Sequence, residues 1–127
     1  MIEVKRTERG WAGHYICSAD CLFRRNTLLE YGDKKWIIST VGCQFVRNEV
    51  LPVGYQRWYE TMAFEATDND GYLDADVTKQ IQFTNDWSIY GKNWTDVLEK
   101  YNNHHDLAAN DMHEKVVEEL MEKIKES

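Results

Sequence analysis

Residues 57–66, RWYETMAFEA, alternate clearly between two sets of side chains. In a β-strand every second side chain points to the same face, so the order of residue types in such a stretch separates two faces. Met62 and Phe64 fall on one face, and Tyr59 and Ala63 fall on the other. The stretch is therefore predicted to be a strand with two partly apolar faces.

Outward from this stretch, the pattern up to residue 83 is mostly that of strands. Gly32-Asp33 reads as a tight hairpin turn between two apolar runs, and Asp68 to Gly71 reads as a second turn. We expect the further strands at Gly13–Ser18, Asn26–Tyr31, Lys35–Val41 and Val77–Phe83.

Beyond Trp94 the apolar period becomes helical. Thr95 can cap a short helix that runs to Tyr101, and Asp111 to Glu114 has the spacing of a capping box, so a longer helix should begin there. Its predicted apolar stripe consists of Val116, Val117, Leu120, Met121 and Ile124. The expected fold is α+β, an antiparallel β-sheet packed with a short helix and a longer C-terminal helix.

Length and charge limit the classes of protein that the chain can belong to. With 127 residues, 43% of them hydrophobic, it is predicted to form a single domain over residues 1–127, neither disordered nor a coiled coil. Residues 1–58 carry nine basic against six acidic side chains, whereas residues 59–127 carry six against sixteen. The overall charge of −7 argues against a general nucleic-acid binder, but a focused arginine pocket can still hold phosphates.

The beginning of the chain and its cysteines suggest a cytoplasmic protein. We find neither a signal peptide nor an apolar run long enough to span a membrane. The odd number of cysteines favours a reducing compartment. His14, Cys17 and Cys21 lack a second ligand pair at zinc-finger spacing, so neither a metal site nor a cofactor is expected.

Arginines and aromatic rings give the clearest chemical signal. Arg24 and Arg25 follow Phe23, and Arg57 precedes Trp58. Guanidinium forks bind phosphates and flat rings stack on bases, which is the chemistry that a nucleotide needs. The alternative is that these arginines pair with the many carboxylates and that the aromatic rings fill the core.

Histidines raise the question of catalysis. His104, His105 and His113 could exchange protons near neutral pH, but no nucleophile motif or phosphate-binding glycine loop accompanies them. Histidines in a loop and at a helix start are the simpler interpretation, and the chain is not expected to be an enzyme.

Two blocks near the N-terminus, Glu8–Cys17 and Cys21–Glu30, resemble the signature of the Thoeris anti-defence type 1 family of small phage and prophage proteins. The similarity extends over nearly the whole chain. Further similar segments are Ser39–Gly42, Tyr59–Phe64, Asp74–Val77 and Met112–Glu114.

This resemblance implies a sponge. Proteins of the family bind the cyclic ADP-ribose isomers made by bacterial TIR-domain enzymes and hold them uncleaved, and some members also take up cyclic oligonucleotides at separate pockets. The expected partner is thus a small cyclic nucleotide signal in the cytoplasm of the bacterial host, with no nucleic acid and no membrane involved. The resemblance also implies a homo-oligomer built from dimers, either a dimer or a hexamer.

The resemblance further implies a ligand pocket made of an aromatic ring, an amide and arginines. Phe83, Asn93 and Arg57 stand at the corresponding positions. Arg24 and Arg25, within the signature block, are further candidates for a second pocket.

Two alternatives come from other classes. The acidic second part could make the chain a protein inhibitor of a host nucleic-acid-binding defence complex, competing with nucleic acid for a basic surface. A small phosphodiesterase that uses His104, His105 or His113 is the third hypothesis.

Overall fold

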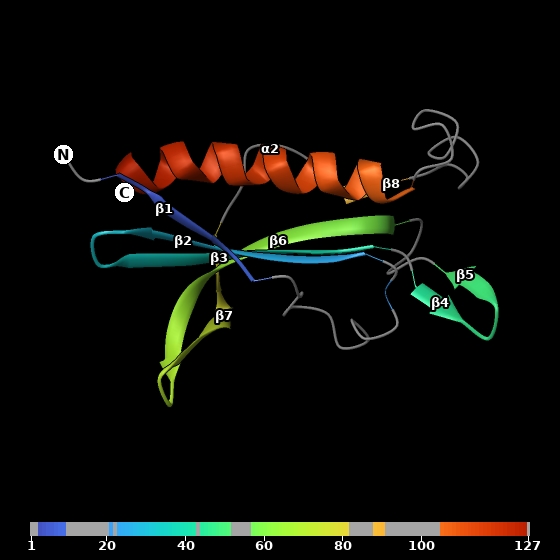
Figure 1. The fold of residues 1–127 in the computed structure, drawn as a ribbon, viewed down its shortest axis with the longest axis horizontal. Coiled ribbons are helices and arrows are strands. Elements are labelled where there is room, and N and C mark those ends of the chain that lie inside the picture. Colours follow the sequence, from blue (N-terminus) through green and yellow to red (C-terminus); the bar gives the residue numbers. More distant parts are fainter. Residues whose placement is uncertain are drawn as a thin grey trace.

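The computed structural model describes residues 3–9, 21, 23–42, 44–51, 57–81, 88–90 and 105–126. The segments predicted as a strand at Gly13–Ser18 and as a short helix at Thr95–Tyr101 lie outside the described residues. The elements are β1 (Lys5–Glu8), β2 (Arg24–Tyr31), β3 (Lys34–Val41), β4 (Gln44–Val46), β5 (Glu49–Leu51), β6 (Arg57–Asn69), β7 (Tyr72–Gln80), β8 (Ser88–Tyr90) and the helix α2 (His105–Glu126), as Figure 1 shows.

The main sheet is antiparallel throughout, in the order β1-β2-β3-β6-β7. β8 also pairs with β6: Glu60 has Ser88 on one side and Val41 of β3 on the other. Phe64, farther along β6, likewise lies between β3 and β7. β7 and β8 therefore share the edge of β6 that faces away from β3. With α2 packed across one face of this sheet, the predicted α+β class is confirmed.

The hairpin predicted at Gly32-Asp33 is confirmed. β2 ends at Tyr31, β3 begins at Lys34, and the two strands pair in register through Leu29 and Trp36. Gly32 has a φ of 59°, a left-handed conformation that glycine adopts without steric cost.

The start predicted for the C-terminal helix is wrong. α2 begins at His105, six residues before Asp111, so the spacing of a capping box falls inside a continuing helix. The helix continues because residues 105–110 contain neither glycine nor proline, and because Ala109, one turn before His113, is fully buried. The buried stripe of α2 therefore extends farther toward the N-terminus than the sequence suggested.

The core fills the space between α2 and the sheet. Apolar side chains from β2, β3 and β6 meet the stripe of α2, and burying each large one stabilises the fold by roughly 1.5 to 3 kcal/mol. The buried members of this cluster are Leu29, Trp36, Ile38, Ala63, Val116, Val117, Leu120 and Ile124. Met121, also predicted on the stripe, packs partly buried against them.

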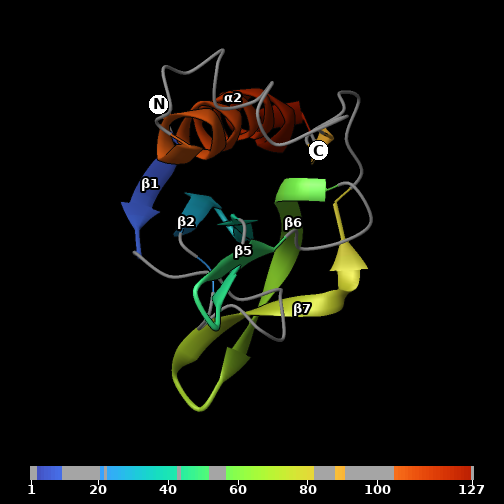
Figure 2. The ribbon, with the colours of Figure 1, turned by 90° about the vertical axis from the view of Figure 1, so that its right-hand side faces the viewer.

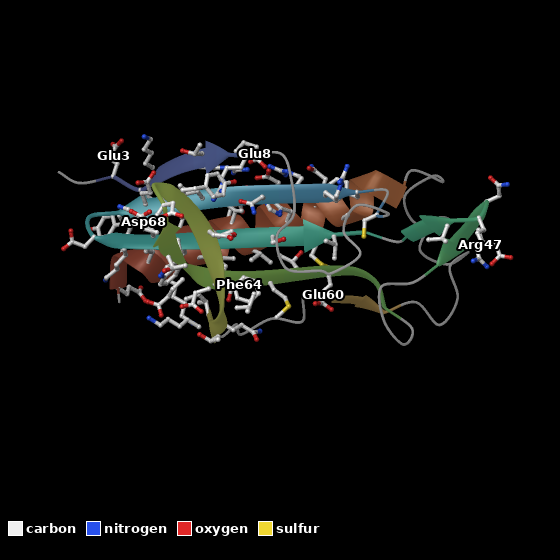
Figure 3. All side chains as sticks on the ribbon, turned by 90° about the horizontal axis from the view of Figure 1, so that it is seen from below. Glu3, Glu8, Arg47, Glu60, Phe64 and Asp68 are labelled. Atoms are coloured by element: carbon white, nitrogen blue, oxygen red, sulfur yellow. The ribbon has the colours of Figure 1, made fainter. Side chains whose placement is uncertain are left out.

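The second face of the sheet is covered in part by the β6–β7 hairpin, which lies on the side opposite α2 (Figures 1 and 2). β7 starts at Tyr72 and not at Val77 as predicted, because a two-residue turn with positive φ at Asp70 (54°) and Gly71 (86°) lets pairing begin immediately. Viewed from below, β7 crosses the other strands diagonally (Figure 3).

A contact between Arg9 and Tyr72 links the two edges of the coiled sheet. The chain leaves β1 through Arg9, whose backbone N–H donates to the Asn26 carbonyl of β2 at 2.7 Å. The Arg9 guanidinium carbon lies 4.5 Å from the centroid of the Tyr72 ring at the start of β7. A cation over an aromatic face is attractive, so this pair fastens the hairpin tip to the β1 side.

We expect Tyr72→Ala to lower the free energy of unfolding by about 1 kcal/mol, because it removes the ring beneath the Arg9 cation. Urea unfolding followed by tryptophan fluorescence measures the change. Tyr72→Phe, which keeps the ring, is the matched control and should remain within about 0.5 kcal/mol of the parent protein. Equal losses in both variants would show that the hydroxyl, and not the ring, makes the contact.

Candidate functional site

The structure describes some of the predicted ligand-binding residues and not others. Arg24 is the first residue of β2, and its side chain is exposed. Arg57 is the first residue of β6, and its backbone pairs with Tyr90 of β8. Phe83 and Asn93 lie outside the described residues, so their proposed role stays a prediction.

The start of β2 and the start of β6 lie at the same end of the sheet. Arg24 is the register partner of Val41, Val41 is the partner of Glu60, and Glu60 is the partner of Ser88. This row crosses four strands, with Arg57 three residues before Glu60. The N-terminal half of α2 lies over the same end, because Asn110 contacts the neighbour of Arg24 in β2.

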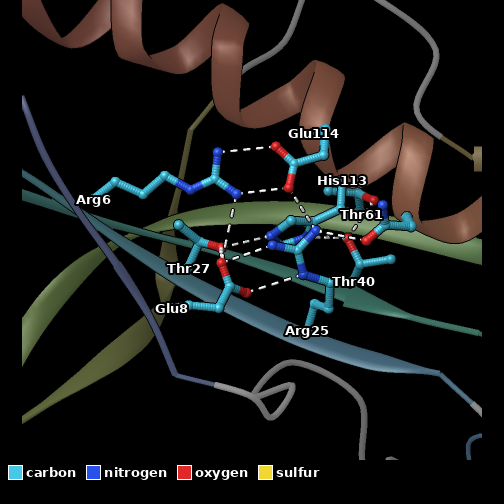
Figure 4. A network of polar contacts seen from close by, with 9 residues as sticks. Arg6, Glu8, Arg25, Thr27, Thr40, Thr61, His113 and Glu114 are labelled. Carbon is cyan, nitrogen blue, oxygen red and sulfur yellow. Dashed lines mark hydrogen bonds and ion pairs between the residues drawn. The ribbon is translucent and has the colours of Figure 1, made fainter.

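Arg25 points to the face covered by α2, where other residues of the chain already bind it (Figure 4). Its Nε and Nη2 donate to the two carboxylate oxygens of Glu8 at 3.0 and 2.7 Å. Its Nη1 donates to Asn110 at 2.8 Å and to Glu114 at 2.7 Å. Partners among the described residues therefore take up four of its five N–H groups, unlike those of the exposed Arg24.

Arg6 completes a cluster of two arginines and two glutamates between β1, β2 and α2. It binds Glu114 through two parallel hydrogen bonds of 2.9 and 2.7 Å, and its Nη2 lies 3.5 Å from Glu8. The two hydrogen bonds from Arg6, aided by the one from Arg25, lower the pKa of Glu114 to about 2 despite its partial burial. Burial raises the pKa of Glu8, but bonds from Arg25 and Thr27 outweigh this and leave that pKa below its ordinary value. Both carboxyl groups are ionised at neutral pH.

His113 lies behind this cluster, fully buried between α2 and the sheet. Its Nε2 is 2.7 Å from the Thr27 hydroxyl, and its Nδ1 is 2.7 Å from the Thr40 hydroxyl. Thr40 in turn lies 2.7 Å from Thr61 of β6. Burial, and next the charge of Arg25, lower the pKa of His113 to about 3, so the ring is neutral at pH 7.

The role of His113 was missed from the sequence, where it was interpreted as a histidine at a helix start. A signal was nevertheless present: His113 stands three and four residues before Val116 and Val117, which places it on the buried stripe. Both of its ring nitrogens are bonded to threonines, so in this arrangement neither is available to a substrate.

Other chemical candidates remain without a site. His14, Cys17 and His104 lie outside the described residues, and Cys21 is buried. Among the described parts of the chain, no three histidine, cysteine or carboxylate side chains gather as metal ligands would. α2, although 22 residues long, is too charged to cross a bilayer, and no other described helix could do so.

No protein-family model, curated protein or solved structure matches the chain.

Proposed function

We propose that the protein is a sponge that binds a small cyclic nucleotide signal, an isomer of cyclic ADP-ribose, and sequesters it without cleaving it. The observation that carries the proposal is the exposure of the Arg24 side chain. In a chain with seven excess negative charges, this arginine is exposed and makes no ion pair with the other described residues. An unpaired guanidinium fork is suited to a phosphate.

The surroundings of Arg24 add support. The start of β6 with Arg57 lies at the same end of the sheet. Phe83 precedes β8 by five residues and Asn93 follows it by three, and β8 pairs with this part of β6. A stacking ring and an amide from these connections would complete the recognition of a nucleotide.

Sequestration requires a high affinity for the ligand and as many protein molecules as ligand molecules, but no catalytic turnover. A dissociation constant of 1 nM corresponds to about 12 kcal/mol, which requires several phosphate bonds and a stacked base in a site that excludes water. We propose that homo-oligomers built from dimers enclose such a site, and that they act in the cytoplasm of the bacterial host.

The experiment incubates the pure protein with a TIR-derived cyclic ADP-ribose isomer, removes free ligand by filtration, heat-denatures the protein and identifies the released compound by mass spectrometry. Intact ligand in stoichiometric amount supports the proposal. A cleaved product would make the protein an enzyme, and no captured ligand would refute binding.

Arg24→Ala should weaken the capture of this ligand by tenfold or more, since a hydrogen bond to a charged group contributes about 1.5 to 3 kcal/mol. Lys115→Ala is the matched control, because it removes one exposed positive charge from α2, which packs on the face of the sheet opposite to the Arg24 side chain. Equal capture by the two variants would remove Arg24 from the site. Isothermal titration calorimetry measures both affinities.

The surface of α2 gives little support to the alternative that the protein is an acidic inhibitor of a host nucleic-acid-binding complex. Its exposed surface carries Lys115 and Lys125 among the carboxylates, which weakens any continuous negative face. A protein that captures no nucleotide but forms a salt-sensitive complex with a host nuclease would favour this alternative.

A further inference from the structure

His113 is a buried titratable group for which ligand sequestration has no direct use, and its hydrogen bonds have only one consistent direction. The chain of contacts runs from Glu8 through Thr27, His113 and Thr40 to Thr61 (Figure 4). Each hydroxyl in it has a single proton to donate. The direction can therefore be worked out from one end.

The charged end sets the direction. Glu8 is ionised and can only accept hydrogen bonds, so the Thr27 hydroxyl, 2.9 Å away, must donate to it. Thr27 has then no proton left for the imidazole, and its oxygen must accept one from Nε2 of His113. The histidine is thereby fixed as the tautomer with its proton on Nε2.

The other end follows from the neutral ring. With its single proton on Nε2, His113 accepts at Nδ1, so Thr40 must donate to it. The Thr40 oxygen in turn accepts from the Thr61 hydroxyl. Every hydroxyl and imidazole proton in this series of hydrogen bonds, from β6 to β1, thus points toward Glu8. Each ring nitrogen of His113 and each hydroxyl of Thr27 and Thr40 has a partner.

We propose that His113 is a positioning residue for Arg25: its Nε2–H directs the Thr27 hydroxyl to Glu8, and Glu8 then fixes the plane of the Arg25 guanidinium. Glu8 is the only carboxylate among the described residues that binds both Nε and Nη2 of Arg25. The plane of Arg25 determines where its remaining Nη2–H points. The consequence for ligand binding rests on the proposed function, whereas the tautomer and the orientation of Arg25 do not.

Thr27→Val and Thr27→Ser form the matched pair for the test. Valine cannot accept a hydrogen bond from Nε2, so we expect the imidazole proton to move to Nδ1. Nδ1–H then donates to the Thr40 oxygen, and the Thr40 hydroxyl donates to Thr61. Serine keeps the hydroxyl and should keep the proton on Nε2. Thr40→Val, which removes the other partner, should also leave the proton on Nε2.

Correlation spectra of the imidazole nitrogens, recorded by NMR at pH 7 without ligand, identify the tautomer. Exchange of the Arg25 Nε–H with solvent, read in the same samples, should be at least tenfold faster in Thr27→Val than in Thr27→Ser. The wild-type spectrum tests the tautomer even where Thr27→Val fails to fold. A wild-type proton on Nδ1, a doubly protonated ring, or unchanged exchange in folded Thr27→Val would overturn the proposal.

Ligand affinity separates this proposal from the proposed function. If wild type captures a cyclic ADP-ribose isomer, Thr27→Val should bind it about tenfold more weakly than Thr27→Ser, and equal affinities would show that the orientation of Arg25 does not matter for binding. If wild type captures none, the proposed function fails, and the positioning role is decided by the tautomer and the exchange rates alone.

Discussion

Lowering the pH from 7 to 4 should reduce the free energy of unfolding by about 3 kcal/mol, because folding lowers the pKa of His113 to about 3. The ordinary pKa of 6.5 applies to the unfolded chain. Between pH 6.5 and 3, His113 is therefore protonated in the unfolded chain and neutral in the folded protein. The stability is complete above pH 6.5 and is lost as the pH falls through this range.

The charges around His113 explain why the effect should be large. Arg6 and Glu8 of β1, Arg25 of β2 and Glu114 of α2 face the ring, and the two glutamates oppose the lowered pKa without cancelling it. Glu8 and Glu114 have lowered pKa values as well, so the stability that they contribute is present above about pH 4.5 and is lost below it. The range from pH 6.5 to 4.5 therefore reports mainly on the histidine.

Urea unfolding at intervals between pH 7 and pH 4 measures this dependence. His113→Gln is the control: it lacks the titrating ring but keeps a polar side chain, and the other histidines are unchanged in it. Its stability should be lower at pH 7 and nearly flat from pH 6.5 to 4.5. A slope of the same size in His113→Gln would assign the effect to other groups.

The parts of the fold that follow from local pattern could be predicted from the sequence. The alternation in residues 57–66 places Ala63 toward α2 and buries Phe64 on the opposite face, and glycine marks the turn between β2 and β3. The turn between β4 and β5 was missed, because Arg47 and Asn48 adopt positive φ values of 52° and 64° without a glycine. Asn48 is of a residue type that tolerates positive φ, but Arg47 is not, so the residue types there give only a weak signal of a hairpin.

The polar cluster could not be predicted, because its members meet through the packing of α2 on the sheet. Arg6 and Glu114 are 108 positions apart in the sequence, and their contact depends on the rotation of the helix and on the register of β1 with β2. Arg24 and Arg25 are predicted together for one pocket, although neighbours in a strand face opposite sides. This alternation is why one of them binds glutamates and the other is exposed.

Arg25→Ala should lower the free energy of unfolding by about 2 to 3 kcal/mol, whereas Arg24→Ala should change it by less than about 0.5 kcal/mol. The first substitution removes four hydrogen bonds and leaves Glu8 and Glu114 near each other with only Arg6 between them. The second removes an exposed side chain that has no ion pair among the described residues. Urea unfolding at pH 7 measures both changes.

Ligand affinity, in contrast to stability, should respond directly to Arg24 and only indirectly to Arg25. Under the proposed function, Arg24→Ala should lose most of the binding of a cyclic ADP-ribose isomer while its unfolding curve stays that of wild type, which separates a ligand contact from a structural one. Arg25→Lys tests the fork in the cluster: it keeps the charge but cannot hold both oxygens of Glu8, so it should recover less than half of the stability lost in Arg25→Ala. Full recovery by lysine would mean that the positive charge alone accounts for the contribution of Arg25 to stability. A destabilised Arg24→Ala would mean that Arg24 supports the fold and is not reserved for a phosphate.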